Sequence, residues 1–297
     1  MKIAMTGSSG LIGSALRTSL NGDGHRVVRL VRRAATGPDE VRIDPRVPVD
    51  PGVFADVDAV VNLAGAGVGD HRWSPAYKRT IRHSRIGTTT AIVRALQSAP
   101  TRRRTLLSAS AIGYYGDDNG DALLMETAPA GADFLATVCR DWEAATMPAR
   151  AAGVRTVQVR TGLVLDRSGG ALAPMLKLFR FGLGGRLGSG GQFWSTISMD
   201  DHIRALRFLL ASPDASGAFN LTAPEPATNA NVTKALGRVL HRPTVLAVPA
   251  FALRAALGQF SSGVLGSARV VPERLLAADF TFRHPTIDSQ LRAVLAD

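Results

Sequence analysis

The sequence contains a single cysteine, Cys139, among 297 residues. One cysteine excludes an intrachain disulfide and a cysteine metal cluster, and we expect no metal site. Long apolar runs are also missing, because the longest one, near residues 248–257, is interrupted by Arg254 and is too short to span a bilayer. The chain begins directly with a core-like strand, so we expect neither a signal peptide nor a membrane partner. These absences favour a cytoplasmic protein.

Lysine is scarce as well. The sequence has 35 Lys and Arg residues, of which the only lysines are Lys2, Lys78, Lys177 and Lys234. With 24 acidic residues, the formal net charge is +11 and the isoelectric point is about 11.0. The arginines are scattered, however, and we see no aromatic-interleaved basic stripe, helix-turn-helix pattern or zinc pattern, so we expect no nucleic-acid partner. The charge instead favours anionic cofactors and a small-molecule substrate, bound by a monomer or homodimer.

What the sequence does contain is a glycine-rich turn near its start. An apolar run over residues 2–6 leads into glycines at positions 7, 10 and 13, and a helical stretch and a β-branched run over 26–31 follow. Glycine permits a tight turn beside a pyrophosphate, and the helix N-terminus offers unpaired N–H groups to phosphates. The pattern predicts the first half of a dinucleotide-binding unit. The cofactor contacts expected in this turn are Thr6, Gly7, Ser9, Gly10, Leu11, Ile12 and Gly13.

The end of the second predicted strand selects between NAD and NADP. An NAD site usually has an acid there for the ribose 2′-hydroxyl, whereas a 2′-phosphate needs arginine. Here Val31 is followed by Arg32 and Arg33, with no acid before Asp39. Two guanidinium groups would bind the phosphate, so we expect NADP (NADPH) as the cofactor. The alternative is that both side chains are solvated arginines of an arginine-rich protein.

Strand and helix patterns alternate up to residue 165. Strands are indicated at 41–43, 58–65, 105–110 and 156–160, helices at 73–96 and 134–150, and an acidic loop at 117–133. The alternation predicts an α/β fold with a doubly wound parallel sheet, that is, a Rossmann fold. The turn after the strand at 58–65 should face the cofactor crevice, because the carboxyl ends of parallel strands do so.

The sequence changes character after residue 165. Glycines crowd residues 169–191 and favour loops rather than a packed helix, whereas a helix is expected at 199–211, a strand at 219–221 and a helix at 231–240. We expect residues 1–165 to form the NADP-binding domain, to which 195–225 return. Residues 166–194 and 226–297 should form a smaller substrate-binding lobe. Arg186 and Gln192 could hold a substrate there, or could simply be exposed loop residues.

Several of these motifs together resemble the extended short-chain dehydrogenase/reductase superfamily, which contains NAD-dependent epimerases and dehydratases. They are the Thr6–Gly13 turn, residues 62–65, residues 108–110, Tyr115-Gly116 and Arg160. Further motifs between Arg72 and Asp201 are similar to an atypical subfamily, that of epimerase family protein 39U1. The resemblance implies a Rossmann fold with a small C-terminal lobe, NADP(H), and epimerase-like oxidoreductase chemistry on a small sugar-nucleotide or carbonyl substrate. Residues 194–199 depart from the subfamily, which usually has a histidine before the Asp-Asp pair.

The resemblance also implies a catalytic serine and a Tyr-x-x-x-Lys dyad. Ser110 fits the serine, but counting back from Glu143 places Leu135 at the tyrosine position and Cys139 at the lysine position. Leucine cannot carry a proton and a buried thiol is not a cation, so the dyad is missing. Tyr114 or Tyr115 could supply the acid instead, or could be a packing tyrosine. The remaining expected cofactor contacts are Asp44, Leu63, Ala64, Gly65, Arg85 and Ser108.

Some alternatives stay open. Arg85 could form an ion pair on its helix instead of contacting the cofactor, and Asp200-Asp201 suit a helix N-cap. Two functions remain: an NADP(H)-dependent oxidoreductase or epimerase that uses Ser110 and a nearby tyrosine, or a non-catalytic NADP(H)-binding sensor or interaction protein. The missing dyad favours the second, and the polar loop residues favour the first.

Overall fold

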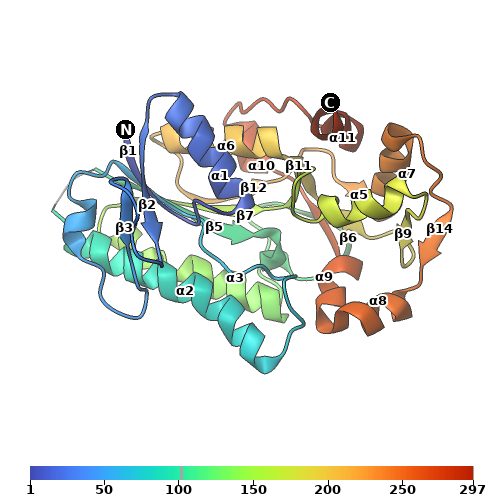
Figure 1. Ribbon diagram of the computed structural model, residues 1–297, viewed down its shortest axis with the longest axis horizontal. Coiled ribbons are helices and arrows are strands. Elements are labelled where there is room, and N and C mark those ends of the chain that lie inside the picture. The colour runs from blue at the N-terminus through green and yellow to red at the C-terminus, as the bar shows by residue number, and fades with distance from the viewer. Residues whose placement is uncertain (101–102, 297) are drawn as a thin grey trace.

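A central parallel sheet of seven strands organises the molecule. A computed structural model describes residues 1–100 and 103–296, and its main sheet has the strand order β12-β7-β5-β4-β1-β2-β3 (Figure 1). Every neighbouring pair in this sheet is parallel, which confirms the predicted Rossmann fold. The strands are β1 (Lys2–Thr6), β2 (Arg26–Val31), β3 (Glu40–Arg42), β4 (Ala59–Asn62), β5 (Thr105–Ala111), β7 (Arg155–Thr161) and β12 (Gly217–Leu221).

Helices cover both faces of the sheet, because its strands are apolar on both sides. In β1, Ile3 and Met5 join one buried cluster with Leu16 and Leu206, whereas Ala4 joins the other. Figure 1 shows α1 and α6 above the sheet and α2 and α3 below it. Two-sided burial is what parallel sheets of α/β proteins require. The flanking elements are α1 (Leu11–Gly22), α6 (Met199–Ala211), α2 (Pro75–Ser98), α3 (Phe134–Ala144), α4 (Met147–Ala151), η1 (Pro51–Phe54) and α10 (Glu273–Ala277).

The strand order reverses beside β1, and this reversal positions the candidate site. The chain runs outward from β1 to β2 and β3, then returns to the other side of β1 and runs outward through β4, β5, β7 and β12. Ligands of open α/β sheets bind at the carboxyl ends of the strands at such a switch point. The turns after β1, β4 and β5 therefore meet at one edge.

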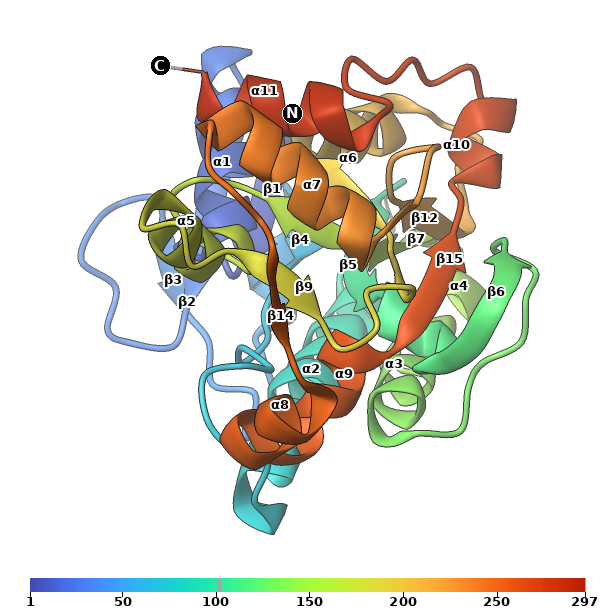
Figure 2. The same cartoon turned by 90° about the vertical axis from the view of Figure 1, so that its right-hand side faces the viewer.

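The second part of the chain adds small sheets and a separate apolar cluster, to which Leu172, Leu236 and Leu291 belong. Figure 2 looks onto this end of the molecule, where α5, α7, α8, β9 and β14 lie in front of the main sheet. The paired strands are β8 (Leu163–Leu165) with β11 (Thr196–Ser198), β9 (Gly185–Leu187) with β14 (Leu246–Val248), β10 (Phe193–Trp194) with β13 (Ala227–Thr228), and β6 (Asp118–Leu124) with β15 (Ser267–Val270). The helices are α5 (Leu172–Arg180), α7 (Asn229–Leu240), α8 (Ala250–Leu257), η3 (Gly258–Phe260), α9 (Ser261–Leu265) and α11 (Ile287–Leu295).

The division into a domain over residues 1–165 and a lobe over 166–194 and 226–297 stays a prediction, although the apolar cluster around Leu172 supports it. None of the helices in the described part of the chain is long and apolar enough to cross a membrane. The cytoplasmic location also stays a prediction.

Three local expectations were wrong. Residues 117–133 are not all loop, because β6 pairs with β15 from the far end of the chain. The helix expected over 134–150 is divided into α3 and α4, and Pro148 lies in the first turn of α4. The glycine-rich stretch contains the helix α5, whose buried face is Leu172, Leu176 and Phe179. This apolar spacing of four and three residues was readable in the sequence, but the surrounding glycines obscured it.

Gly13 is the glycine of the first turn with the least space. A Cβ added there would lie 2.1 Å from the carbonyl oxygen of Gly7, which is backbone and cannot easily move away. The first turn of α1 therefore packs directly on the glycine turn. By contrast, a Cβ added to Gly22, at the other end of the same helix, would have no neighbour within 4 Å.

We predict that Gly13→Ala lowers the free energy of unfolding by about 1–3 kcal/mol, because the methyl group overpacks the turn. Gly22→Ala is the matched control and should leave stability unchanged or raise it, since alanine is the better helix former. Urea unfolding of the two variants and the wild type would measure the difference. Equal stability of the two variants would contradict the close packing of the turn.

Candidate functional site

The turn between β1 and α1 has the shape that a pyrophosphate needs. Gly7 adopts a φ of 67°, and the N–H of Gly10 donates to the carbonyl oxygen of Gly7 at 3.0 Å. A Cβ on Gly7 would lie 2.6 Å from the carbonyl oxygen of Leu63, so the turn also touches the turn after β4. Gly10 is the N-cap of α1 and offers no side chain to the first N–H groups of the helix. These groups remain available to an anionic ligand.

The other residues predicted for this turn lie where the sequence placed them, but with different side-chain roles. The Thr6 hydroxyl is buried and donates to the Asn62 side chain at 2.7 Å, so only the Thr6 backbone faces the turn. Ser9 is exposed, and Leu11 and Ile12 are half-buried at the start of α1. Their contacts with a cofactor stay predictions.

Arg32 and Arg33, which follow β2, differ in their contacts. They are therefore not the pair of free guanidinium groups that the sequence predicted. Arg33 donates from both terminal nitrogens to Glu40, at 2.7 and 2.6 Å. The hydrogen bond from Arg33 lowers the pKa of Glu40 to about 2. Arg33 is therefore already engaged, whereas Arg32 is exposed and has no partner among the described side chains. Sequence reasoning missed Glu40 because that acid follows the strand end by several residues.

A third arginine, Arg29, lies beside the phosphate turn, although the sequence did not single it out. Its Nε donates to the Ser8 hydroxyl at 3.3 Å, and its Nη1 lies 2.7 Å from Glu40. The only sign of Arg29 in the sequence was its position between the apolar residues of β2, where its side chain is partly buried. Arg29 thus ties the turn to the loop that holds Arg33.

The remaining predicted cofactor contacts come from three strand ends. Asp44 follows β3 and pairs with Arg46 at 2.7 Å, which lowers the pKa of Asp44 to about 2. Ser108 is fully buried in β5. The turn Leu63-Ala64-Gly65 follows β4, and the guanidinium of Arg85 from α2 lies against Gly65. These roles stay predictions, and only the Leu63–Gly65 turn and Arg85 lie beside the glycine turn.

Ser110 lies at the carboxyl end of β5 in a hydrogen-bond network. Its hydroxyl donates to Glu143 Oε1 at 2.7 Å. Arg160 from β7 donates to both oxygens of the same carboxylate, at 2.8 and 2.9 Å. Burial opposes the charge of Arg160, but the hydrogen bonds that Arg160 donates to Glu143 raise its pKa overall. Glu143 therefore links Ser110 to Arg160, and it orients the Ser110 hydroxyl.

The two tyrosines after β5 are not equivalent. The hydroxyl of Tyr115 is buried between Arg160 Nη1, at 3.0 Å, and Asn220 Oδ1, at 2.8 Å. Burial also raises the pKa of Tyr115. The geometry does not favour the predicted catalytic role of Tyr115, because its hydroxyl already donates to Asn220. Tyr114 is half-buried, its ring lies 3.4 Å from the Arg160 guanidinium, and its hydroxyl bonds to no described residue.

Leu135 and Cys139, the residues predicted for the dyad positions, lie beside the turn after β5 and Ser110. A Cβ added to Gly113, in the turn after β5, would be 3.5 Å from Leu135 Cβ and 3.9 Å from Cys139 Sγ. The thiol also interacts with the Ser110 hydroxyl, and burial raises the pKa of Cys139 to about 12. A neutral thiol cannot replace an ammonium group. The register inferred from Glu143 therefore agrees with the structure.

No lysine among the described residues takes the missing place. Lys2 pairs with Asp56 below the sheet, and Lys78 lies over the ring of Phe134 at 4.8 Å. Lys177 and Lys234 are exposed on α5 and α7. The edge of the sheet near Ser110 is therefore without a lysine ammonium group.

The two predicted substrate contacts also differ. Gln192 is buried, and its Nε2 donates to the carbonyl oxygen of Leu187 at 3.0 Å, which does not favour its predicted role as a substrate ligand. It holds the glycine-rich loop together instead. Arg186 is exposed on β9, with its stem beside Gly190, and its substrate role stays a prediction.

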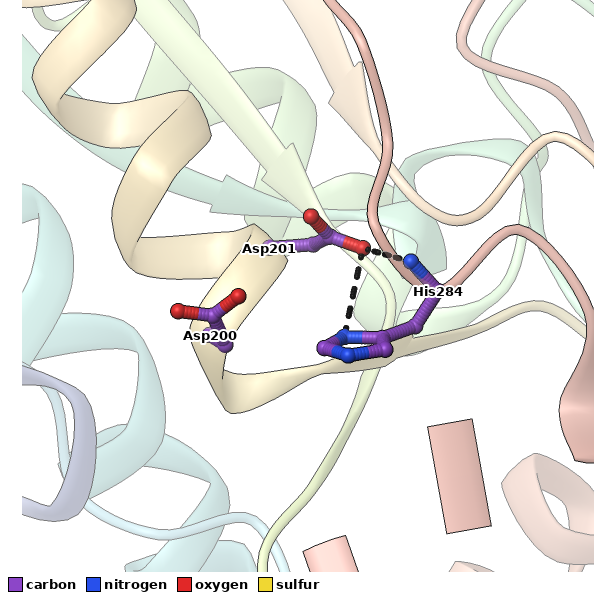
Figure 3. A group of neighbouring side chains, drawn as sticks. All are labelled: Asp200, Asp201 and His284. Atoms are coloured by element: carbon purple, nitrogen blue, oxygen red, sulfur yellow. Dashed lines mark hydrogen bonds and ion pairs between the residues drawn. The ribbon is translucent and has the colours of Figure 1, made fainter. Parts of the chain in front are cut away.

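Asp200, Asp201 and His284 form the one acidic and histidine group in the described residues that could hold a metal ion (Figure 3). Asp201 already accepts hydrogen bonds from the backbone N–H groups of Arg283 and His284, at 3.0 and 2.7 Å. It also pairs with Arg204 at 2.7 Å. The group therefore fastens the segment before α11 to α6. The expected cap was wrong in detail, because Ser198 is the N-cap and the two aspartates occupy the first turn.

The chain is similar to known proteins over nearly its whole length. The model of the NAD dependent epimerase/dehydratase family matches residues 3–222, and a domain of unknown function matches residues 248–294. An epimerase family protein of Mycobacterium bovis is 47% identical over 291 residues, which cover 97% of this chain and 96% of the relative. A chloroplastic epimerase family protein SDR39U1 homolog of Arabidopsis thaliana is 37% identical and covers 99% of this chain and 87% of its own length.

A solved structure agrees with these matches. Human epimerase family protein SDR39U1, crystallised with NADPH, superposes with a TM-score of 0.88 at 30% identity and covers 99% of both chains. The family model, which matches residues 3–222, covers the glycine turn, the turns after β4 and β5, and the Ser110 network described above. The chain therefore belongs to the NAD dependent epimerase/dehydratase family.

Proposed function

We propose that this chain is an NADPH-dependent oxidoreductase of the epimerase type that acts on a small carbonyl or sugar-nucleotide substrate. One observation carries the proposal: the glycine turn lies at the same sheet edge as Ser110 and Tyr114. The human relative crystallised with NADPH supports the choice of cofactor. The high positive charge supports a small anionic substrate rather than nucleic acid or a membrane, and a monomer or homodimer would suffice.

The residues present fit a dinucleotide. Gly10 leaves open space beside the helix N-terminus, since an added Cβ would meet only the Gly7 carbonyl oxygen at 3.4 Å. A pyrophosphate there would accept hydrogen bonds from the free N–H groups of α1. Arg32 would bind the 2′-phosphate, because it follows β2 directly and has no partner among the described residues. The chemistry that the cofactor supplies when bound is hydride transfer.

The proton would pass through this chain's own side chains. Tyr114 offers a hydroxyl that donates to no described acceptor, and Arg160 fixes its ring from below. Ser110 donates to Glu143, so its lone pairs are free to accept from a substrate hydroxyl. Tyr114 would thus act as the acid, and Ser110 would orient the substrate.

A second candidate function has one specific observation in its favour. The residues assigned to the superfamily tyrosine and lysine positions, Leu135 and Cys139, lie near Ser110, and neither can transfer a proton at neutral pH. A protein that binds NADPH to sense it, or to engage a partner, would not need them. The two functions differ in turnover and not in cofactor binding.

We predict that Arg32→Ala weakens NADPH binding about 10- to 100-fold and leaves NADH binding unchanged. The reason is the loss of a charge-assisted contact worth about 1.5–3 kcal/mol. Arg33→Ala is the matched control and should have the smaller effect, since Arg33 pairs with Glu40. Fluorescence titration with both cofactors measures this. Equal wild-type affinities for NADPH and NADH would remove the assignment.

We predict that Gly10→Val abolishes NADPH binding while the protein stays folded. The valine side chain would extend into the pyrophosphate space without meeting backbone at short range. Circular dichroism melting and NADPH titration of the same sample would test both halves. Retained binding at an unchanged Tm would place the phosphates elsewhere.

We predict that Tyr114→Phe lowers kcat for NADPH-dependent reduction by about 100-fold or more, the usual size of a lost general acid. A panel of small carbonyl compounds, followed by NADPH absorbance, gives the activity. Tyr115→Phe should instead reduce stability, because it removes the buried hydroxyl that donates to Asn220 Oδ1 and accepts from Arg160 Nη1. A wild type that binds NADPH but consumes none with any compound would favour the sensor function.

A further inference from the structure

Arg85 is a partly buried cation at the edge of the sheet, and no anionic side chain among the described residues pairs with it. It comes from the middle of α2, and its Nη1 donates to the carbonyl oxygen of Ile81 at 3.1 Å. No carboxylate in the described part of the chain pairs with it, so the ion pair that the sequence allowed on this helix is not formed. Burial lowers the pKa of Arg85, which shows that its charge is poorly solvated.

The guanidinium is fixed by two surfaces that enclose the crevice. On one side is Gly65, in the turn after β4, where an added Cβ would lie 3.1 Å from Arg85 Cζ and 3.3 Å from Nη2. On the other side is the ring of Trp142 from α3, whose centroid lies 5.3 Å from Cζ. A side chain at position 65 would press on the guanidinium and shift it by a few tenths of an ångström. The guanidinium therefore has little freedom to turn away from the edge.

The missing lysine would have projected into the same place. Cys139 is on α3, one turn before Trp142, and its thiol interacts electrostatically with Arg85. The same thiol interacts with Ser110. Arg85 thus stands next to the lysine position, but it reaches there from α2 rather than from α3.

Hydrogen bonding defines what Arg85 could bind. A guanidinium has five N–H donors, and only one bond to a described residue is formed. Arg85 is half-buried and none of its nitrogens is both fully buried and unpaired, so hydroxyl oxygens of a ligand could accept from the remaining donors in place of water. In a dinucleotide whose pyrophosphate lies at Gly10, the second ribose would lie along this sheet edge, on the side of the turn after β4 and Ser110.

We propose that Arg85 takes over the ribose-binding role of the missing lysine, donating from α2 to the hydroxyl groups of the nicotinamide ribose of NADPH. This proposal rests on the proposed function. Arg85 is in this view a positioning residue, because it holds the ribose and leaves proton transfer to Tyr114. In this proposal the positive charge that a lysine on α3 would supply comes instead from Arg85 on α2.

The test compares two ligands that differ by the second ribose. NADPH contains it, whereas 2′-phosphoadenosine 5′-diphosphate ends at the pyrophosphate. Arg85→Met should weaken NADPH binding about tenfold or more and leave the affinity for the shorter ligand unchanged. Arg85→Gln, measured in parallel, should show the same selective loss. Arg79→Met is the matched control, because Arg79 is an exposed arginine on the same helix, and it should bind both ligands as the wild type does.

A rescue variant separates this role from a purely structural one. Arg85→Met combined with Cys139→Lys places a cation at the superfamily position, and it should recover most of the lost NADPH affinity. A role limited to packing on Trp142 would not be rescued from another helix. Equal NADPH binding by the wild type, Arg85→Met and Arg85→Gln would overturn the proposal, as would an equal loss for both ligands or a failed rescue. A wild type that binds neither ligand would overturn the proposed function itself.

Discussion

The ion pair between Glu143 and Arg160 holds the candidate site together. It joins α3 to β7, and each partner also bonds to another element: Glu143 to Ser110 on β5, and Arg160 to the Tyr115 hydroxyl. Both side chains are largely buried, with 13% and 5% of their surface exposed. Removing one partner from such a pair typically costs about 3–5 kcal/mol, because the other charge is left unpaired in the interior. The orientation of Ser110 and the packing of both tyrosines depend on it.

The parts of the fold that were predictable are those whose cause is local. The glycine turn could be inferred because Gly7, Gly10 and Gly13 each satisfy a backbone requirement that acts within a few residues. The parallel sheet could be inferred because β1 and β4 are buried on both faces and are separated by helical patterns. By contrast, β6 depends on β15, which lies far along the chain, and its own sequence is acidic and exposed.

The candidate site divides in the same way. The residues after β2 pointed to Arg32, and the family resemblance pointed to Ser110, Leu135 and Cys139; their roles stay predictions. What the sequence did not reveal was the partner of each side chain, since Glu40 engages Arg33 and Asn220 engages Tyr115 only after folding. The prediction for Gln192 has the same weakness. A glycine-rich segment suggests exposed residues, whereas the Gln192 side chain donates to the backbone of its own loop. Residue types indicate which chemistry a side chain can perform, but the neighbours in the fold determine whether that side chain is free to bind a ligand.

The last strand of the main sheet has a consequence for the synthesis of the protein. β12 pairs with β7 in register from Gly217 to Leu221, yet the chain between them builds α5, the small strands and α6 first. A nascent chain that has emerged only as far as β7 therefore carries an open parallel edge, a surface that readily pairs with other chains. At translation rates of about 5–20 residues per second, β7 waits roughly 3–12 s for β12. During the synthesis of residues 162–221, β7 is thus an unpaired edge strand, a position that β12 takes over once it has paired.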